Sequence, residues 1–299
     1  MARIRWLERN DIEDTKWDHC VERSPHGDVY ALSGYLDIMA KQWSGLVQDD
    51  YAAVLPIPWN RKYGIPYVYT PRFIGALPLC GDPANTLPLA DFLAVIPGRF
   101  FSWDLDISTD PIAQKIPHAH RLRNSHVLDL QPTYESLFGR FRSSYRNLVR
   151  QCGRKGYTAG LYEDHAGIIS LAAHKKEIPG MKRDDYRRFE ELCTWLSGRK
   201  MLEVWETLSP GGQRCAGAIF AITGRKIYYL LAWNNDEGRR VGASHVLMDR
   251  VIAKHAATNL VMDFEGSEVP EIAYFLEGFG GHIHPSLFVR HSILQPRKQ

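Results

Sequence analysis

The residues whose spacing points most directly to chemistry form a short segment in the second half of the chain. The segment follows a predicted strand at residues 226–233 and opens a predicted helix at residues 242–258. Small residues there let backbone N–H groups approach a diphosphate, and a helix N-terminus favours negative charge. The segment fits the pattern Arg/Gln-x-x-Gly-x-Gly/Ala and predicts a diphosphate-binding loop made of Arg239, Arg240, Val241, Gly242, Ala243 and Ser244. A loop that needs a glycine only for its turn explains the same residues without a ligand.

Two carboxylates stand at the end of the next predicted strand, residues 260–264. Asp263 and Glu265 are two residues apart, so on a strand their side chains share one face. A carboxylate at this position could take a proton from an attacking amine or hold an ammonium group. A polar strand end whose carboxylates accept hydrogen bonds from loop N–H groups explains the pair equally well. His245, in the first turn of the preceding helix, is a third candidate base.

A basic stripe runs along the middle of the chain. Residues 133–153 place apolar side chains at helical spacing, and beside them arginines recur at every fourth position, namely Arg142, Arg146, Arg150 and Arg154. The forked donors of arginine match phosphate oxygens, so Arg146 and Arg150 are candidate contacts to an anionic ligand. A solvated basic face is the alternative interpretation.

The elements predicted around these groups alternate between strands and helices. Strand-like runs with tight turns dominate the first 132 residues. In the second half, helices at 162–176 and 183–196 precede strands at 201–208, 216–222 and 226–233, and a helix, a strand, a helix and a strand follow. This order predicts mixed α/β architecture. A chain of 299 residues fits two domains, which we place at residues 1–132 and 133–299, the second beginning with the basic helix.

Composition narrows the class of protein. Apolar residues make up 44% and charged residues 24% of the chain, the ordinary balance of a folded globular protein. Charges, glycines or prolines interrupt every apolar stretch before the roughly 18 residues that a membrane helix needs, and the first residues lack the pattern of a signal peptide. We therefore expect a cytoplasmic protein without membrane insertion. The five scattered cysteines favour reduced thiols, and His282, His284 and His291 lack a well-spaced third ligand, so we expect no metal.

Several segments, in this order and spacing, resemble the GNAT acyltransferase superfamily and, more closely, its Fem-like branch with two GNAT-type domains in tandem. The resemblance runs from about residue 50 to residue 290, and no single segment is specific for it. The segments that carry it are Leu55-Pro-Ile-Pro58, Tyr69-Thr-Pro71, Asn124-Ser-His-Val-Leu-Asp-Leu130, Tyr134-Glu-Ser-Leu137, Ser144-Tyr-Arg-Asn-Leu-Val-Arg-Gln-Cys-Gly-Arg-Lys-Gly156, Met262-Asp-Phe-Glu-Gly-Ser267, Tyr274-Phe-Leu-Glu-Gly-Phe279 and Phe275-Leu-Glu-Gly-Phe-Gly-Gly281.

The resemblance implies a fold and a set of roles. The fold would be α/β (α+β), with two tandem GNAT-like domains that are each a mixed, mainly antiparallel sheet flanked by helices. The segment 239–244 would hold the diphosphate of acyl-coenzyme A, and the strand before it would lie along the pantetheine. Tyr274, in the ending Tyr-x-x-x-Gly-Phe, would protonate the departing thiolate. A tyrosine packed in the core is the alternative for this residue.

The activity implied is an N-acyltransferase that moves an acyl group from acyl-coenzyme A to a small-molecule or peptide amine. A backbone N–H of residues 228–233 would polarise the donor carbonyl. Typical Fem enzymes instead transfer amino acids from aminoacyl-tRNA to a peptidoglycan precursor, and the arginine stripe favours that donor. The pattern at 239–244, the lack of a long coiled-coil insertion and a net charge of only +3 favour the thioester. A catalytically silent module that binds an anionic ligand is the third interpretation.

Overall fold

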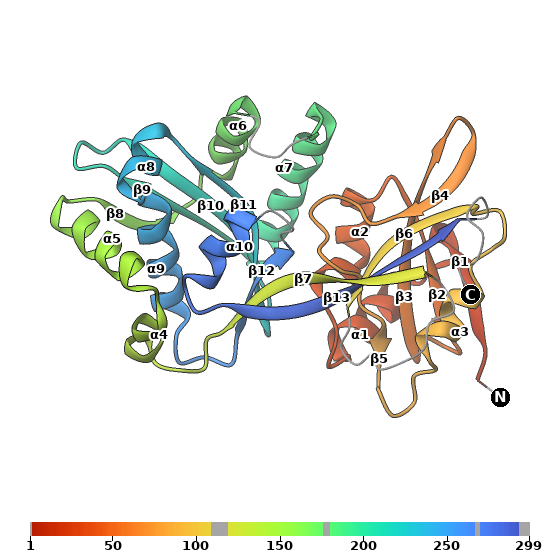
Figure 1. Cartoon of the computed structure of the whole chain (residues 1–299). Helices are drawn as coiled ribbons and strands as arrows, with labels where there is room; N and C mark the ends of the chain where they lie inside the picture. Colours follow the sequence, from red (N-terminus) through yellow and green to blue (C-terminus); the bar gives the residue numbers. More distant parts are fainter. Residues whose placement is uncertain (1, 109–118, 176–179, 267–269, 293–299) are drawn as a thin grey trace. The chain divides into compact units, whose positions relative to one another are not determined.

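The computed structural model describes residues 2–108, 119–175, 180–266 and 270–292 (Figure 1). The chain forms two compact units, Met1–Arg123 with Pro285–Gln299, and Asn124–His284. The first unit includes the end of the chain because the last strand, β13 (His282–Ser292), pairs with a strand of the first unit from Ser286 onward. The domain boundary expected after residue 132 stays a prediction. The compact units divide after Arg123 and after His284.

In the first unit the strands follow the order β1-β2-β3-β4-β6-β13. Neighbours are antiparallel except β4 and β6, which are parallel, and the two-residue strand β5 pairs with the start of β3. The elements are β1 (Ile4–Glu8), α1 (Asp14–Arg23), α2 (Ser33–Met39), β2 (Gln42–Gln48), β3 (Ala53–Lys62), β4 (Ile65–Tyr69), β5 (Cys80–Gly81), α3 (Leu89–Ala94) and β6 (Ser102–Ser108).

In the second unit the strands follow the order β7-β12-β11-β10-β9-β8, antiparallel except for the parallel pair β11–β12. The strands are β7 (Ala119–Asp129), β8 (Thr158–Tyr162), β9 (Leu202–Leu208), β10 (Arg214–Ile222), β11 (Lys226–Asn234) and β12 (Val261–Gly266). The helices are α4 (Tyr134–Arg140), α5 (Ser143–Arg154), α6 (His165–Lys175), α7 (Arg183–Gly198), α8 (Asp236–Val241), α9 (Ala243–His255) and α10 (Pro270–Glu277).

Helices cover both faces of the sheet of the second unit (Figure 1). Alternate residues of β10 divide the two faces, as the period of a strand requires. Ala216 and Ala218 belong to the buried cluster that includes α9, whereas a Cβ placed on Gly217 would lie 2.0 Å from the side chain of Ile168 on α6. Because both faces are buried, β10 is apolar along nearly its whole length.

The basic helix expected at residues 133–153 is two helices, so this prediction was wrong. Phe141 and Arg142 leave the helical conformation with ψ of 145° and 142°. The backbone N–H of Arg142 donates to the carbonyl of Gly278 (2.9 Å) instead of continuing the helix. The apolar periodicity runs through the break because Leu137 and Tyr145, on either side of it, face the same core.

The prediction of a loop between β11 and the following helix was also wrong, because residues 236–241 form the helix α8. Asn235 caps this helix, since its side chain accepts a hydrogen bond from the N–H of Gly238 (2.7 Å). Asp236 stands in the first turn and arginines in the last, as the helix dipole favours. Gly242 ends α8 in the left-handed conformation (φ 81°) and begins α9.

We expect Gly238→Ala to lower the free energy of unfolding by about 1–3 kcal/mol. A Cβ at this position would lie 2.1 Å from the backbone oxygen of Cys215, so α8 would have to move away from β10. Gly139→Ala is the matched control, since this glycine is also helical and has no atom within 4 Å of its added Cβ. It should leave stability unchanged or raise it by up to about 1 kcal/mol. Urea unfolding of both variants measures this; equal effects would contradict the packing argument.

Candidate functional site

The strands β11 and β12 separate part-way along the sheet. They pair through Lys226 with Val261, Ile227 with Met262, and Tyr228 with Asp263. β11 continues to Asn234 in pairing with β10, so beyond Tyr228 its other edge has no β12 partner among the described residues. The free edge points toward the carboxyl end of the parallel pair, where ligands bind in open α/β sheets. An extended ligand could form backbone hydrogen bonds along it.

A β-bulge lies at the start of this free edge. Ile219 of β10 pairs with Leu231 and Phe220 pairs with Tyr229, so Leu230 is the extra residue of β11. A bulge leaves its extra residue outside the ladder and re-aims the local backbone. The backbone of β11 thus departs from regular pairing with β10 at Leu230, just past its last pair with β12.

The junction of α8 and α9 carries the six residues expected to bind a diphosphate. Arg239 and Arg240 are exposed on α8, Gly242 and Ala243 are buried, and Val241 and Ser244 are half-buried. Arg239 donates to the side chain of Asn234 (3.1 Å). Arg240, by contrast, makes no ion pair with a described residue. The N–H of His245 donates to the carbonyl of Gly242 (2.9 Å), whereas the N–H groups of Ala243 and Ser244 come too early in α9 to find an acceptor within the helix. The junction therefore combines two amide donors with two exposed guanidinium groups.

The helix α5 packs against one side of this junction. A Cβ on Gly242 would lie 3.3 Å from the side chain of Leu148 and 3.3 Å from Nδ1 of His245. Cys152 donates from its thiol to the carbonyl of Val241 (2.7 Å). Gly242 therefore serves both the left-handed turn and a close helix contact, and ligand access is limited to the side that carries the arginines and Ser244.

The two candidate carboxylates do not share a face. Glu265 has φ of 64°, and the pairing of β12 with β7 shifts register between Asp263 and Gly266, so the alternation assumed from their spacing is broken. Asp263 Oδ1 accepts hydrogen bonds from the hydroxyl of Ser125 (3.1 Å) and the N–H of Glu265 (3.0 Å). Its Oδ2 lies 3.8 Å from the ammonium of Lys226. Asp263 thus fixes the end of β12, and both carboxylates are half-buried.

Tyr274 lies on α10 with 58% of its surface exposed, so it is not a core residue. The guanidinium carbon of Arg142 lies 3.7 Å from the centre of its ring. The same arginine donates to the carbonyl of Tyr274 (2.6 Å) and pairs with Glu277 (3.2 Å). The hydroxyl of Tyr274 is thus held at the surface of the second unit on a ring that a cation covers.

The two arginines expected to contact an anion have different roles in the structure. Arg146 is half-buried and donates to the carbonyl of Gly139 (2.9 Å), so it satisfies the end of α4. Arg150 is exposed and lies over the ring of Phe138 at 5.5 Å. Together with Arg154 and Lys155, which are also exposed, Arg150 leaves a shorter basic surface at the end of α5 than the sequence indicated.

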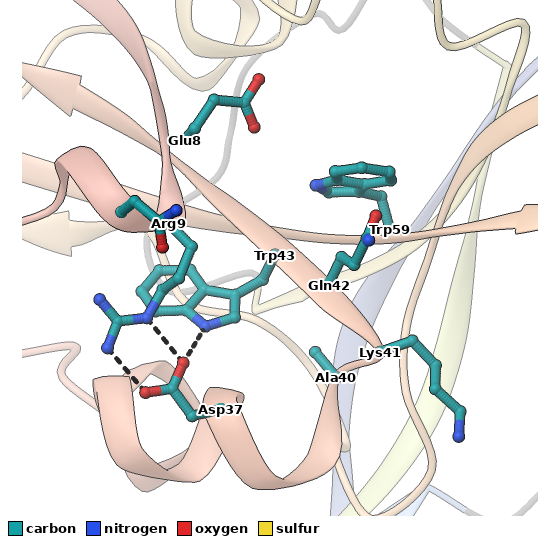
Figure 2. A pocket seen from close by; sticks show the side chains of 9 residues that line it. Glu8, Arg9, Asp37, Ala40, Lys41, Gln42, Trp43 and Trp59 are labelled. Atoms are coloured by element: carbon teal, nitrogen blue, oxygen red, sulfur yellow. Dashed lines mark hydrogen bonds and ion pairs between the residues drawn. The ribbon is translucent and has the colours of Figure 1, made fainter.

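The first unit contains a pocket of about 320 Å³, lined by Glu8, Arg9, Asn10, Asp37, Ala40, Lys41, Gln42, Trp43 and Trp59 (Figure 2). Burial alone would raise the pKa of Asp37, but hydrogen bonds from Arg9 and Trp43 outweigh it and lower the pKa. Arg9 also pairs with Asp14 (2.7 Å), and Arg99 pairs with Glu8. The charges of this pocket therefore compensate one another, which suits a neutral polar ligand better than an ion.

The residues that the structure describes contain no group of three or more His, Cys, Asp or Glu side chains that could hold a metal ion. Within the same residues, no helix has the length and apolarity needed to cross a bilayer.

Comparison with known proteins gives a likeness in structure but not in sequence. No family model matches the chain, and no curated protein matches it. The structure of FemX superimposes with a TM-score of 0.63 and 12% identity over 93% of this chain and 96% of that one. A tandem GNAT protein from the clavulanic acid biosynthesis pathway, solved without AcCoA, superimposes with a TM-score of 0.58 and 11% identity over the whole of both chains.

The chain has a tandem GNAT fold of the Fem-like kind. L-PGS from Bacillus licheniformis is a further neighbour, with a TM-score of 0.57 and 11% identity over 97% of this chain and 94% of that one. The expected fold class is thereby confirmed. The chain has a mixed, mainly antiparallel sheet with helices, and the tandem GNAT protein superimposes on the whole of it.

Two further residues lie beside the candidate groups and were not found from the sequence. Tyr229 precedes the bulge and stacks on Phe220 (5.1 Å between ring centres), and burial raises the pKa of its hydroxyl, which therefore stays protonated. His126 on β7 is 2% exposed and faces the shifted part of β12, with Nε2 3.5 Å from Oε1 of Glu277. The alternation within β11 could have singled out Tyr229. No local pattern identifies His126, because its place depends on the pairing of β7 with β12.

The candidate base His245 is set among aromatic rings of the GNAT-fold second unit, 4.4 Å from Tyr145 and 5.0 Å from Phe275 between ring centres. Burial lowers the pKa of His245 to about 4, with a smaller opposing effect of a hydrogen bond to the backbone of Gly242. The imidazole is therefore neutral at pH 7, and it is a weak base there.

We expect this histidine to make the protein sensitive to mild acid. The unfolded chain binds the proton near pH 6.5 and the folded chain only near pH 4, so stability falls as the pH drops through this window. Between pH 7 and pH 5 the loss due to His245 should be about 2 kcal/mol. In His245→Gln the difference between urea unfolding at the two pH values should shrink by that amount. His174→Gln, at an exposed position of α6, should leave the difference unchanged; identical behaviour of the two variants would contradict the prediction.

Proposed function

We propose that the protein is an N-acyltransferase that moves an acyl group from acyl-coenzyme A to an amine. The observation that carries the proposal is the free edge of β11. It begins at the bulge around Leu230 and runs to Asn234, directly before α8 and the N-terminus of α9 at Gly242. Such an edge can pair with the amide groups of a pantetheine arm, while the helix N-terminus and Arg240 suit a diphosphate.

The residues present fit the donor in three respects. Gly242, Ala243 and Ser244 keep bulk away from the first N–H groups of α9. Arg239 and Arg240 are exposed beside them. The charge of a diphosphate would there meet guanidinium groups and the positive end of a helix dipole. The likeness of fold to a tandem GNAT protein described with reference to AcCoA is consistent with this donor.

The reaction needs no covalent enzyme intermediate. The nitrogen of the amine attacks the thioester carbonyl, whose oxygen accepts a hydrogen bond from the backbone at residues 230–231. The C–N bond forms, the C–S bond breaks, and the thiolate takes the proton of the Tyr274 hydroxyl. The ammonium proton released by the attacking nitrogen goes to a carboxylate. We assign this last role to Glu265, because Asp263 already holds three groups at the end of β12; Asp263 would act by keeping Glu265 in place.

Binding of the donor tests the proposal directly. Wild-type protein should bind acetyl-coenzyme A in calorimetry, and Arg240→Glu should weaken binding at least about tenfold, since it replaces an attractive charge with a repulsive one. Arg225→Glu is the matched control, because it makes the same charge change just before β11, at the far end of the strand from Asn234. No binding by the wild type at millimolar concentration would refute the thioester donor. Binding without transfer to any amine would favour the silent module.

An aminoacyl-tRNA donor is the second candidate, and the exposed basic residues at the end of α5 are what favour it. If tRNA binds there, wild-type protein should retard it in a gel at low salt. Arg150→Glu should abolish the retardation without disturbing α4, whereas Arg146→Glu would also remove the hydrogen bond to Gly139. Absence of retardation by the wild type would dismiss this donor.

A further inference from the structure

Arg142 belongs by sequence to the basic stripe, but the structure gives it a different place. Its backbone N–H donates to the carbonyl of Gly278, just after the end of α10. Its side chain donates to the carbonyl of Tyr274 (2.6 Å) and pairs with the carboxylate of Glu277 (3.2 Å). One residue in the link between α4 and α5 thus holds the last turn of α10 through three hydrogen-bonded contacts.

The same guanidinium also covers the ring of Tyr274, with Cζ 3.7 Å from the ring centre. An exposed tyrosine side chain otherwise exchanges between staggered rotamers. Here the cation that stacks on the ring is itself fixed by the backbone carbonyl of the same residue and by Glu277. The stack therefore restricts the torsions that direct the hydroxyl. Guanidinium stacking of this kind depends on the planar shape of arginine, which lysine does not share.

Further polar groups complete the arrangement. Glu277 divides its carboxylate between Arg142, at Oε2, and the buried His126, at Oε1 (3.5 Å). The hydroxyl of Tyr145 lies 3.4 Å from the carbonyl of Tyr274. Arg142 is half-buried and all its described partners belong to α5 or α10 and the residue after it, so it is not available to a phosphate without giving up these contacts.

We propose that Arg142 is a positioning residue for the acid Tyr274: it fixes the ring, and through it the direction of the hydroxyl, for proton transfer to the leaving thiolate. The proposal rests on the acyltransferase function for its catalytic meaning. Glu277 acts through Arg142, by holding its guanidinium in place.

A double-mutant cycle tests the proposal. Arg142→Gln should lower kcat about tenfold or more and leave KM for acetyl-coenzyme A within about twofold, because misplacing a catalytic group affects the chemical step. In the Tyr274→Phe background, which keeps the ring but lacks the proton, Arg142→Gln should change kcat less than about twofold. Arg142→Lys should give an intermediate kcat. Arg187→Gln, at an exposed position of α7, should leave kcat unchanged. Equal losses from Arg142→Gln in both backgrounds would overturn the proposal.

A second readout keeps the test independent of transfer. 3-Fluorotyrosine placed at position 274 should give a ¹⁹F resonance displaced from that of the free amino acid, and Arg142→Gln should move it toward the free value. Arg150→Gln should leave it in place, and thermal unfolding of each variant verifies that it is folded. An unchanged resonance in Arg142→Gln overturns the proposal whatever the activity. A shifted resonance with no transfer by the wild type shows that Arg142 holds Tyr274 and that the proposed acyltransferase function is wrong.

Discussion

The separation of β11 from β12 is the constraint on which the second unit depends, and one carboxylate sits where it begins. Asp263 of β12 accepts a hydrogen bond from Ser125 of β7 and lies near the ammonium of Lys226, the first residue of β11. It also accepts a hydrogen bond from the N–H of Glu265, whose backbone is left-handed and lies where the pairing of β12 with β7 shifts register. Side chains of three strands thus meet at one group, and the strands diverge immediately beyond it. Without this tie, parallel pairing could continue and close the edge that we assign to the donor.

The remaining elements maintain that opening. The bulge at Leu230 displaces the backbone of β11 just past its last pair with β12. On the other side of the opening, α5 packs on the α8–α9 junction through Leu148 and Cys152. Arg142, directly before the N-terminus of α5, contacts α10. Helix α5 therefore links the two ends of the candidate site: the α8–α9 junction, which we propose binds the diphosphate, near its C-terminus and Tyr274 near its N-terminus. A residue that moves α5 should affect both.

The sequence allowed much of this architecture to be predicted, for physical reasons. The helix at 183–196 and the strands at 201–208, 216–222 and 226–233 are found close to their predicted bounds, because their periodicity follows from burial of a face. The short strand β8 and the helix α8 were missed. The first exposes most of its length. The second is six residues long, and its caps are its main signal in the sequence. We interpreted Asn235 as a loop residue and Gly242 as the start of the next helix.

The site was less predictable, since its residues act through contacts that sequence spacing does not encode. The arginine stripe illustrates this. Four arginines at every fourth position suggest one charged face, yet the break at Phe141 gives Arg142 to α10 and Arg146 to the end of α4. Both guanidinium groups donate to backbone carbonyls that water would otherwise bond, so they stabilise the fold and are not free to contact a ligand. Only Arg150 and Arg154 remain exposed. The basic surface that favours a nucleic-acid donor is therefore smaller than the count of arginines implies. Arg142, which does not belong to this surface, instead stands over Tyr274, the residue that we propose as the acid for a thioester donor.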